Sequence, residues 1–562
     1  KLPLTVNGKV DRKALPAPTD QQADADMVAP RTETEAKLVE IWQEVLGMDR
    51  IGITDNFFAS GGHSLKAIAL VAKIEKVFQV SVPLKELFSR PTIQALSKYV
   101  DAAEKDHYQV IQPAPKQEFY PVTSAQKRLY VLQGLENIGR GYHIPILLQL
   151  KGKLDIARLR FALNTIVKRH EILRTSFQLV KGELKQKIHE KVILPFAYYE
   201  LDEAEVEAML EEWMQPFDLR QAPLLRACLI RLAEERHLLA LDLHHIVADG
   251  MSAQLLMQEW LKLYQGQVLP EPKLQYKDYA VWHQQWLKQG RMKQHETYWL
   301  KQFQGELPTL HLPTDYPRPA VQQFAGDRYS FTLSAALSQR LKRLCSRQGV
   351  TLYMLLFAAY NVWLMKMSGQ KDIIVGSPIL GRPHEDLKQM IGMFVNTVAI
   401  RNRLKQDQPF TQLLAQMKKQ ILDAYEHGEY PLEELLEKLE LERDLSRNPL
   451  FDTVFAYQPL EQQEFSTSDL KVTPYEQPWK TAKFDMTWTV VEEPERIGIS
   501  IEYSTALWNQ ATIERMTQHF TWLLEQIAEQ PEINLAALEL VTPAEKQQLL
   551  EGFNQTQMDY PK

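Results

Sequence analysis

The sequence predicts a multidomain protein in which a small all-α domain precedes a larger α/β region. Residues 31–103 carry helical patterns and no strand pattern, whereas residues 119–541 alternate helical patterns with short apolar runs typical of strands. The second region is too long for one compact hydrophobic core, so we expect it to form two lobes. A proline-rich segment, 312–319, is the best place for their junction, which predicts lobes of 119–312 and 313–541.

The composition is that of a folded protein without a nucleic-acid or membrane partner. The 562 residues are 45% hydrophobic and 24% charged, and the net charge of -6 comes without a dense run of Lys or Arg. No signal peptide opens the chain, and polar residues interrupt its most apolar helical stretch, 351–367, so we expect a cytoplasmic protein without a membrane span. Cys228 and Cys345 lack metal-ligand spacing, which predicts ordinary buried thiols and no metal site.

Four helices are predicted in the all-α domain, which should therefore be a four-helix bundle. The first begins at a capping box, Thr32 to Glu35, and ends before Gly47. The others follow a loop over 48–62 and occupy 64–78, 84–88 and 93–100. Two segments that contain prolines, 17–30 and 104–118, are interpreted as linkers on either side of this domain.

The strand patterns of the α/β region are short and apolar. They cover 238–247, 372–376, 394–400 and 497–503, and helical patterns such as 156–169 and 252–264 lie between them. Catalytic groups collect at strand ends in α/β folds, so polar residues that directly follow these runs are the first candidates for a site.

Ser64 is the first candidate site residue. It follows Gly61-Gly62-His63 and falls at the first turn of the second helical pattern. Helix N-termini carry partial positive charge and unpaired N–H groups, so a phosphodiester on this hydroxyl would be favoured there. The ordinary interpretation of an isolated serine at this place is an N-cap. Capping and attachment are compatible, since we expect the hydroxyl to be exposed.

The second candidate site is the segment from His244 to Gly250. The apolar run 238–243 should form a buried strand that brings His244 and His245 to its carboxyl end, where Asp249-Gly250 makes a turn. Adjacent strand residues point to opposite faces, so we expect one histidine in the site and the other packed behind it. Imidazole suits the removal of a proton from an amine that attacks an activated acyl group. The alternative is a pair of core histidines beside a turn aspartate.

Residues 31–103 resemble the peptidyl carrier domains of nonribosomal peptide synthetases. The resemblance lies in the segment from Asp55 through Asn-Phe-Phe to Gly-Gly-His-Ser64. It implies that Ser64 carries 4′-phosphopantetheine, added by a separate phosphopantetheinyl transferase. His63 before the serine resembles carriers that feed condensation domains.

Residues 119–541 resemble the condensation domains of the same synthetases. Six motifs follow in family order, at 124–132, 169–177, 244–250, 276–282, 391–397 and 443–451. The resemblance implies two chloramphenicol-acetyltransferase-like lobes arranged as a V. It also implies an amide-forming acyltransferase of antibiotic biosynthesis, which transfers an acyl group from a carrier thioester to the amine of an aminoacyl group on a downstream carrier.

The same resemblance assigns roles within the second candidate site. It implies that His245 is the catalytic histidine and that Gly250 lies close to the reacting carbonyl, while His244 is structural. Whether His245 is a general base or positions the amine stays open.

Asp249 is expected to be structural and to pair with a buried arginine. Arg382 is the first choice of partner, and Arg169 and Arg174 are the reserves.

The two ends of the chain resemble neighbouring parts of such synthetases. Residues 1–16 resemble the end of an adenylation domain and 542–562 the linker into the next one, so we expect a carrier–condensation pair cut from a tyrocidine-synthetase-like assembly line. The expected partners are an upstream adenylation domain and downstream adenylation and carrier domains, and we expect a monomer. Two alternatives remain open, an epimerisation domain with the same His-His-x-x-x-Asp core and a non-catalytic scaffold that docks carriers.

Overall fold

A computed structural model describes most of the chain. The described residues are 27–105, 110–134, 139–382, 384–442, 444–459, 469–475, 480–493 and 495–554. The predicted adenylation remnant, most of the first linker and the last residues of the C-terminal linker lie outside them. Contacts divide the chain into two compact units, 1–108 and 109–562.

The first unit is a bundle of four helices, as predicted. They are α1 (Glu33–Leu46), α2 (Ser64–Phe78), α3 (Leu84–Ser89) and α4 (Ile93–Ala102). The Thr32 side chain caps α1 by accepting from the backbone N of Glu35, and Gly47 ends it with a φ of 73°. The core is aromatic at its centre, where Trp42 and Phe57 meet edge to face with 5.1 Å between ring centroids.

The second unit begins with a lobe built on a five-stranded sheet of order β12-β2-β7-β6-β5. Its strands are β2 (His143–Gly152), β5 (Phe196–Glu200), β6 (Leu225–Ala233), β7 (Arg236–His244) and β12 (Leu470–Pro474). The same part of the chain also forms a smaller sheet of order β1-β4-β3. Its strands are β1 (Tyr120–Pro121), β3 (Thr175–Val180) and β4 (Glu183–Ile188). The helices are α5 (Ser124–Gln133), α6 (Ile156–Arg169), α7 (Val206–Trp213), α8 (Gly250–Tyr264), α9 (Tyr276–Trp286) and α10 (Gly290–Gln302).

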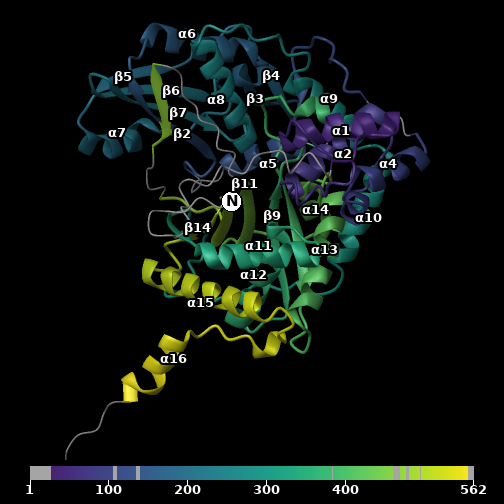
Figure 1. The fold of residues 1–562 in the computed structure, drawn as a ribbon. Helices are drawn as coiled ribbons and strands as arrows, with labels where there is room; N and C mark the ends of the chain where they lie inside the picture. Colours follow the sequence, from purple (N-terminus) through teal and green to yellow (C-terminus); the bar gives the residue numbers. More distant parts are fainter. Residues whose placement is uncertain are drawn as a thin grey trace, which may run out of the picture. The chain divides into compact units, whose positions relative to one another are not determined.

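The second lobe is built on a six-stranded sheet of order β10-β9-β11-β13-β14-β8. Its strands are β8 (Gly326–Thr332), β9 (Asp372–Ile379), β10 (Asn396–Arg403), β11 (Thr453–Pro459), β13 (Met486–Glu492) and β14 (Ile497–Ser504). Its helices are α11 (Ala335–Gln348), α12 (Leu352–Ser368), α13 (Phe410–Glu426), α14 (Leu432–Leu439), α15 (Gln510–Glu529) and α16 (Pro543–Leu550). Helices α11, α12 and α15 lie along one side of this sheet (Figure 1). Because α12 is buried all round, its sequence is apolar without a polar face.

Segments of the second lobe complete the core of the first. Strand β12 pairs antiparallel with β2, and its Leu470 and Val472 join the same buried cluster as Leu243 of β7. The loop before β10 contributes Ile391 and Phe394 to that cluster. The predicted α/β fold of two lobes is therefore confirmed, but the lobes share one core across the 312/313 junction. The periodicity of the sequence predicts which residues are buried but not which residues they pack against, so it does not reveal this exchange.

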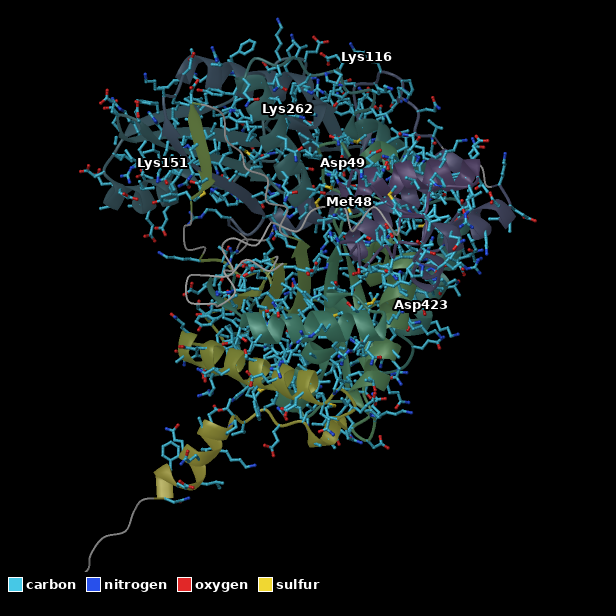
Figure 2. The ribbon with its side chains drawn as sticks, in the orientation of Figure 1. Met48, Asp49, Lys116, Lys151, Lys262 and Asp423 are labelled. Atoms are coloured by element: carbon cyan, nitrogen blue, oxygen red, sulfur yellow. The ribbon has the colours of Figure 1, made fainter. Side chains whose placement is uncertain are left out.

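Charged side chains such as Lys151 and Lys262 point outward from the second unit (Figure 2). Among the described residues, no single helix has the length and apolar character needed to cross a membrane, and only the bent pair α11 and α12 meets that test when taken together, at 106°. Both cysteines are buried and unpaired, as predicted.

Candidate functional site

Ser64 is the first residue of α2, as the sequence predicts, but its surface is almost closed. The N-cap is the preceding residue, His63, whose Nδ1 accepts from the backbone N of Lys66 at 3.4 Å. Ser64 itself is only 2% exposed, so the expectation of an exposed hydroxyl is wrong. Gly62 lies against the Phe57 ring, where a Cβ would come within 2.4 Å, so the loop before α2 is closely packed. Burial of a side chain depends on which segments pack over it, and the sequence pattern of a helix start does not reveal them.

His244 ends strand β7 and is packed behind the site. It is fully buried, its Nδ1 accepts from the backbone N of Ile246 at 3.0 Å, and its Nε2 lies 3.2 Å from Oε1 of Gln133. Burial, with a further contribution from His143, holds the pKa of His244 well below its usual value. His244 is therefore a neutral core histidine, as the strand alternation predicts.

His245 is half-buried and lies in the turn directly after β7. Its backbone N donates to the carbonyl of Tyr142 at 2.8 Å, and its buried Nδ1 has no hydrogen-bond partner among the described side chains and backbone. Burial and, to a smaller extent, the charge of Lys483 lower the pKa of His245 to about 3, while Asp249 opposes the shift. The imidazole is consequently neutral at physiological pH.

Asp249 anchors the loop that follows the two histidines. It caps α8 by accepting from the backbone N of Ser252 at 2.7 Å, and its other oxygen accepts from the backbone N of Phe394 at 3.1 Å. Its ionic partner is Arg382, whose Nη2 lies 3.1 Å from Oδ1 of Asp249. The side chain of Asp249 is 3% exposed and that of Arg382 is 2% exposed. The Arg382 guanidinium also donates to Ser252 Oγ and lies 4.0 Å from the Phe394 ring centroid. Asp249 thus ties α8 to the loop before β10.

The two reserve arginines lie elsewhere. Arg169 donates to Glu259 at 3.1 Å, and Arg174 donates to the backbone carbonyl of His189 at 2.5 Å. Of the three candidates, the structure brings Arg382 to Asp249.

We expect Asp249→Ala to destabilise the second unit by about 3–5 kcal/mol, because the Arg382 charge would stay buried without its partner. Urea unfolding measures this. Asp155→Ala is the matched control, since Asp155 caps α6 in the same way but pairs with Arg158 at the exposed surface. That variant should lose only about 1 kcal/mol. Normal stability of Asp249→Ala together with lost catalysis would contradict the structural role.

Gly250 is the first residue of α8 and is exposed. A Cβ built there would meet no atom within 4 Å. The missing side chain therefore leaves open space at the N-terminus of α8, five residues after His245 in the chain.

The motif at 124–132 holds the two lobes together. Ser124 Oγ donates to Glu434 of α14 at 3.0 Å, and Arg128 pairs with Glu433 at 3.3 Å. These contacts join α5 to α14 on the far side of the 312/313 junction.

Three groups near the site were not predicted from the sequence. The carbonyl of Tyr142 accepts from the backbone N of His245, and Ser252 exchanges hydrogen bonds with the backbone of Gly392. The charge of Lys483 contributes to the lowered pKa of His245. The motif at 391–397 signals Gly392, whereas no motif contains Tyr142 or Lys483.

Comparisons with protein families match two domains. Residues 36–100 match the family described as phosphopantetheine attachment site, and residues 116–550 match the condensation domain family. The first match confirms the expected cofactor, and both agree with the resemblance found in the sequence.

Curated relatives cover the whole chain. It is similar to tyrocidine synthase 3 of Brevibacillus parabrevis, with 50% identity over 100% of this chain, and to gramicidin S synthase 2 of Aneurinibacillus migulanus, with 47% identity over 100%. The chain spans only 9% and 13% of these two relatives.

Solved structures share the fold of the second unit. The X-domain from teicoplanin biosynthesis has a TM-score of 0.71 and 26% identity, covering 77% of this chain and 100% of that one. The first condensation domain of the CDA synthetase has a TM-score of 0.61 and 19% identity, covering 75% and 99%.

Proposed function

The chain belongs to the condensation domain family, with a phosphopantetheine attachment domain ahead of it, and on this basis we propose that it forms amide bonds in nonribosomal peptide synthesis. The donor is an aminoacyl or peptidyl thioester and the acceptor is the amine of an aminoacyl thioester. The amine nitrogen attacks the thioester carbonyl carbon and the C–S bond breaks. The nitrogen loses one proton, and the leaving sulfur takes up one proton to become the free thiol.

Ser64 is the proposed attachment residue. It lies at the N-terminus of a helix of 15 residues, whose partial positive charge suits a phosphodiester. When bound, 4′-phosphopantetheine supplies a thiol that carries the acyl group as a thioester. The fit rests on the helix terminus and on the two preceding glycines, Gly61 and Gly62.

His245 is the proposed catalytic residue, and the single observation that carries the function is its neutral, half-buried ring in the loop between β7 and α8, directly after a histidine that is fully buried. A pKa of about 3 lies far below that of an α-amine, about 8, so the ring does not hold the amine proton at equilibrium. It accepts a hydrogen bond from the neutral amine and orients the nitrogen toward the carbonyl. Asp249 and Arg382 position the loop, and His244 supports it from behind.

We extend the proposal to the domain limits and the partners. The limits are 31–103 for the carrier, 119–312 and 313–541 for the two lobes, and 17–30, 104–118 and 542–562 for linkers. The partners are an upstream adenylation domain, downstream adenylation and carrier domains, and a phosphopantetheinyl transferase.

Intact-mass measurement tests the function. The chain is treated with the transferase and an aminoacyl-coenzyme A, a loaded acceptor carrier is added, and both masses are followed. The proposal expects the acyl mass to leave this chain and appear on the acceptor. Retention of the acyl mass together with exchange of its α-proton for deuterium would indicate an epimerase, and retention without exchange would indicate a docking scaffold.

A further inference from the structure

Lys483 lies in a segment that leads from residue 480 into β13 of the second lobe. The backbone of this residue is held on three sides. Its carbonyl accepts from Nε2 of Gln322 and from Nδ2 of Asn448, each at 3.1 Å, and its N donates to Glu502 at 3.4 Å. Asn448 belongs to the motif at 443–451, so this motif acts on Lys483 through its backbone.

Asp485, two residues further on, fixes the same segment. Its carboxylate pairs with Arg318, and its backbone N donates to the carbonyl of Asp452 at 3.0 Å. The direction in which the Lys483 side chain leaves the segment is therefore set by several hydrogen bonds.

The Lys483 side chain reaches from the second lobe to the first. Its Nζ lies 5.1 Å from the centroid of the Tyr142 ring, within the range of a cation–π contact. The carbonyl of the same tyrosine accepts from the backbone N of His245. The ammonium group thus packs against the residue that supports the catalytic histidine.

Charged groups from several elements surround this pair. Asp249 at the start of α8 faces His245, while Glu502 of β14 and Arg128 of α5 face Lys483, with Glu433 of α14 paired to Arg128. His143 of β2 and His244 of β7 complete the neighbourhood of the imidazole. Burial lowers the pKa of Lys483, Glu502 opposes this, and Arg128 adds to it.

We propose that Lys483 is a positioning residue of the condensation site, which presents a positive charge to the His245 imidazole from the opposite lobe so that this ring stays an uncharged hydrogen-bond acceptor. A positive charge at this place also disfavours an incoming ammonium, so the acceptor amine is bound in its neutral form. This role rests on the proposed function, since it concerns how His245 meets the amine. It also gives the 443–451 motif a purpose, because Asn448 holds the lysine in place.

The test measures the ionisation of His245 without requiring condensation. Diethylpyrocarbonate modifies only the neutral imidazole, and site-resolved mass spectrometry of the full chain between pH 4.5 and 8 gives the rate at His245. In the wild-type chain we expect no loss of rate down to pH 4.5. In Lys483→Met the midpoint of the modification rate should rise by about two to three pH units, which brings it into the measured range, because a nearby like charge that disfavours the imidazolium has been removed.

Two variants serve as controls, and both should behave as the wild type. Lys483→Arg keeps the charge. Lys480→Met removes a lysine three residues away that is 60% exposed and pairs with Glu207. If Lys483→Met does not fold, Lys483→Gln takes its place. An unchanged His245 profile in the folded variant overturns the proposal, as does an equal shift in Lys480→Met.

Condensation assays add a second readout. We expect Lys483→Met to lose about tenfold or more in kcat/KM, mainly through a higher KM for the acceptor at lower pH, and Lys483→Arg to retain the wild-type value. If the wild-type chain does not condense, the proposed function fails, while the modification profile still reports whether Lys483 sets the His245 charge.

Discussion

Replacing Ser64 by Ala should abolish every mass gain from the phosphopantetheinyl transferase, and with it all acyl transfer from this chain. The effect is all or none, because the phosphodiester needs an oxygen atom at this position and alanine has none. The fold should survive, since His63 and not Ser64 provides the N-cap of α2. Intact-mass measurement after treatment with transferase and coenzyme A detects whether the mass gain is lost.

Ser60→Ala is the matched control for Ser64→Ala. Ser60 is a half-buried hydroxyl in the same loop, four residues before Ser64, and should be modified neither in the wild type nor in the variant. We therefore expect Ser60→Ala to gain the full mass. A mass gain in Ser64→Ala would place the attachment on another residue and refute the assignment.

Replacing His245 by Ala should lower the rate of condensation by about 10²-fold or more, because the ring that orients the amine nitrogen toward the carbonyl is lost. The imidazole is half-buried, and its neutral form is the only one that accepts a hydrogen bond from the amine. Because the ring is half-buried and its Nδ1 makes no hydrogen bond with the described residues, stability should change little. Single-turnover transfer to a loaded acceptor measures the rate.

His244→Ala provides the contrast with His245→Ala. His244 is fully buried and bonded to Gln133 and to the backbone of Ile246, so its loss should cost about 1–3 kcal/mol of stability and affect the rate mainly through folding. His244→Ala should therefore unfold at a lower urea concentration than His245→Ala, whereas His245→Ala should show the slower turnover. Undiminished turnover in His245→Ala would defeat the proposed mechanism.

The local patterns of the sequence predicted the four helices of the first unit and the strands β7, β9, β10 and β14, but not other strands such as β2, β6 and β12. Helix starts and apolar runs depend on interactions over a few residues, which periodicity and capping residues reveal. The predicted capping box formed only in part, because the Glu35 side chain accepts from the backbone N of Arg31 and not of Thr32. The predicted strand 238–247 ends early, so that His245 lies in the turn after β7 and not on the strand.

Only the tertiary structure decided which distant groups meet. Three arginines were candidates for Asp249, and packing selected Arg382, 133 residues away in the sequence. Packing also closed the surface over Ser64, exchanged β12 between the lobes and brought Lys483 to Tyr142. The physical reason is that hydrogen bonds, ion pairs and apolar contacts between remote segments depend on how whole elements pack. The periodicity along the chain does not show which elements pack together.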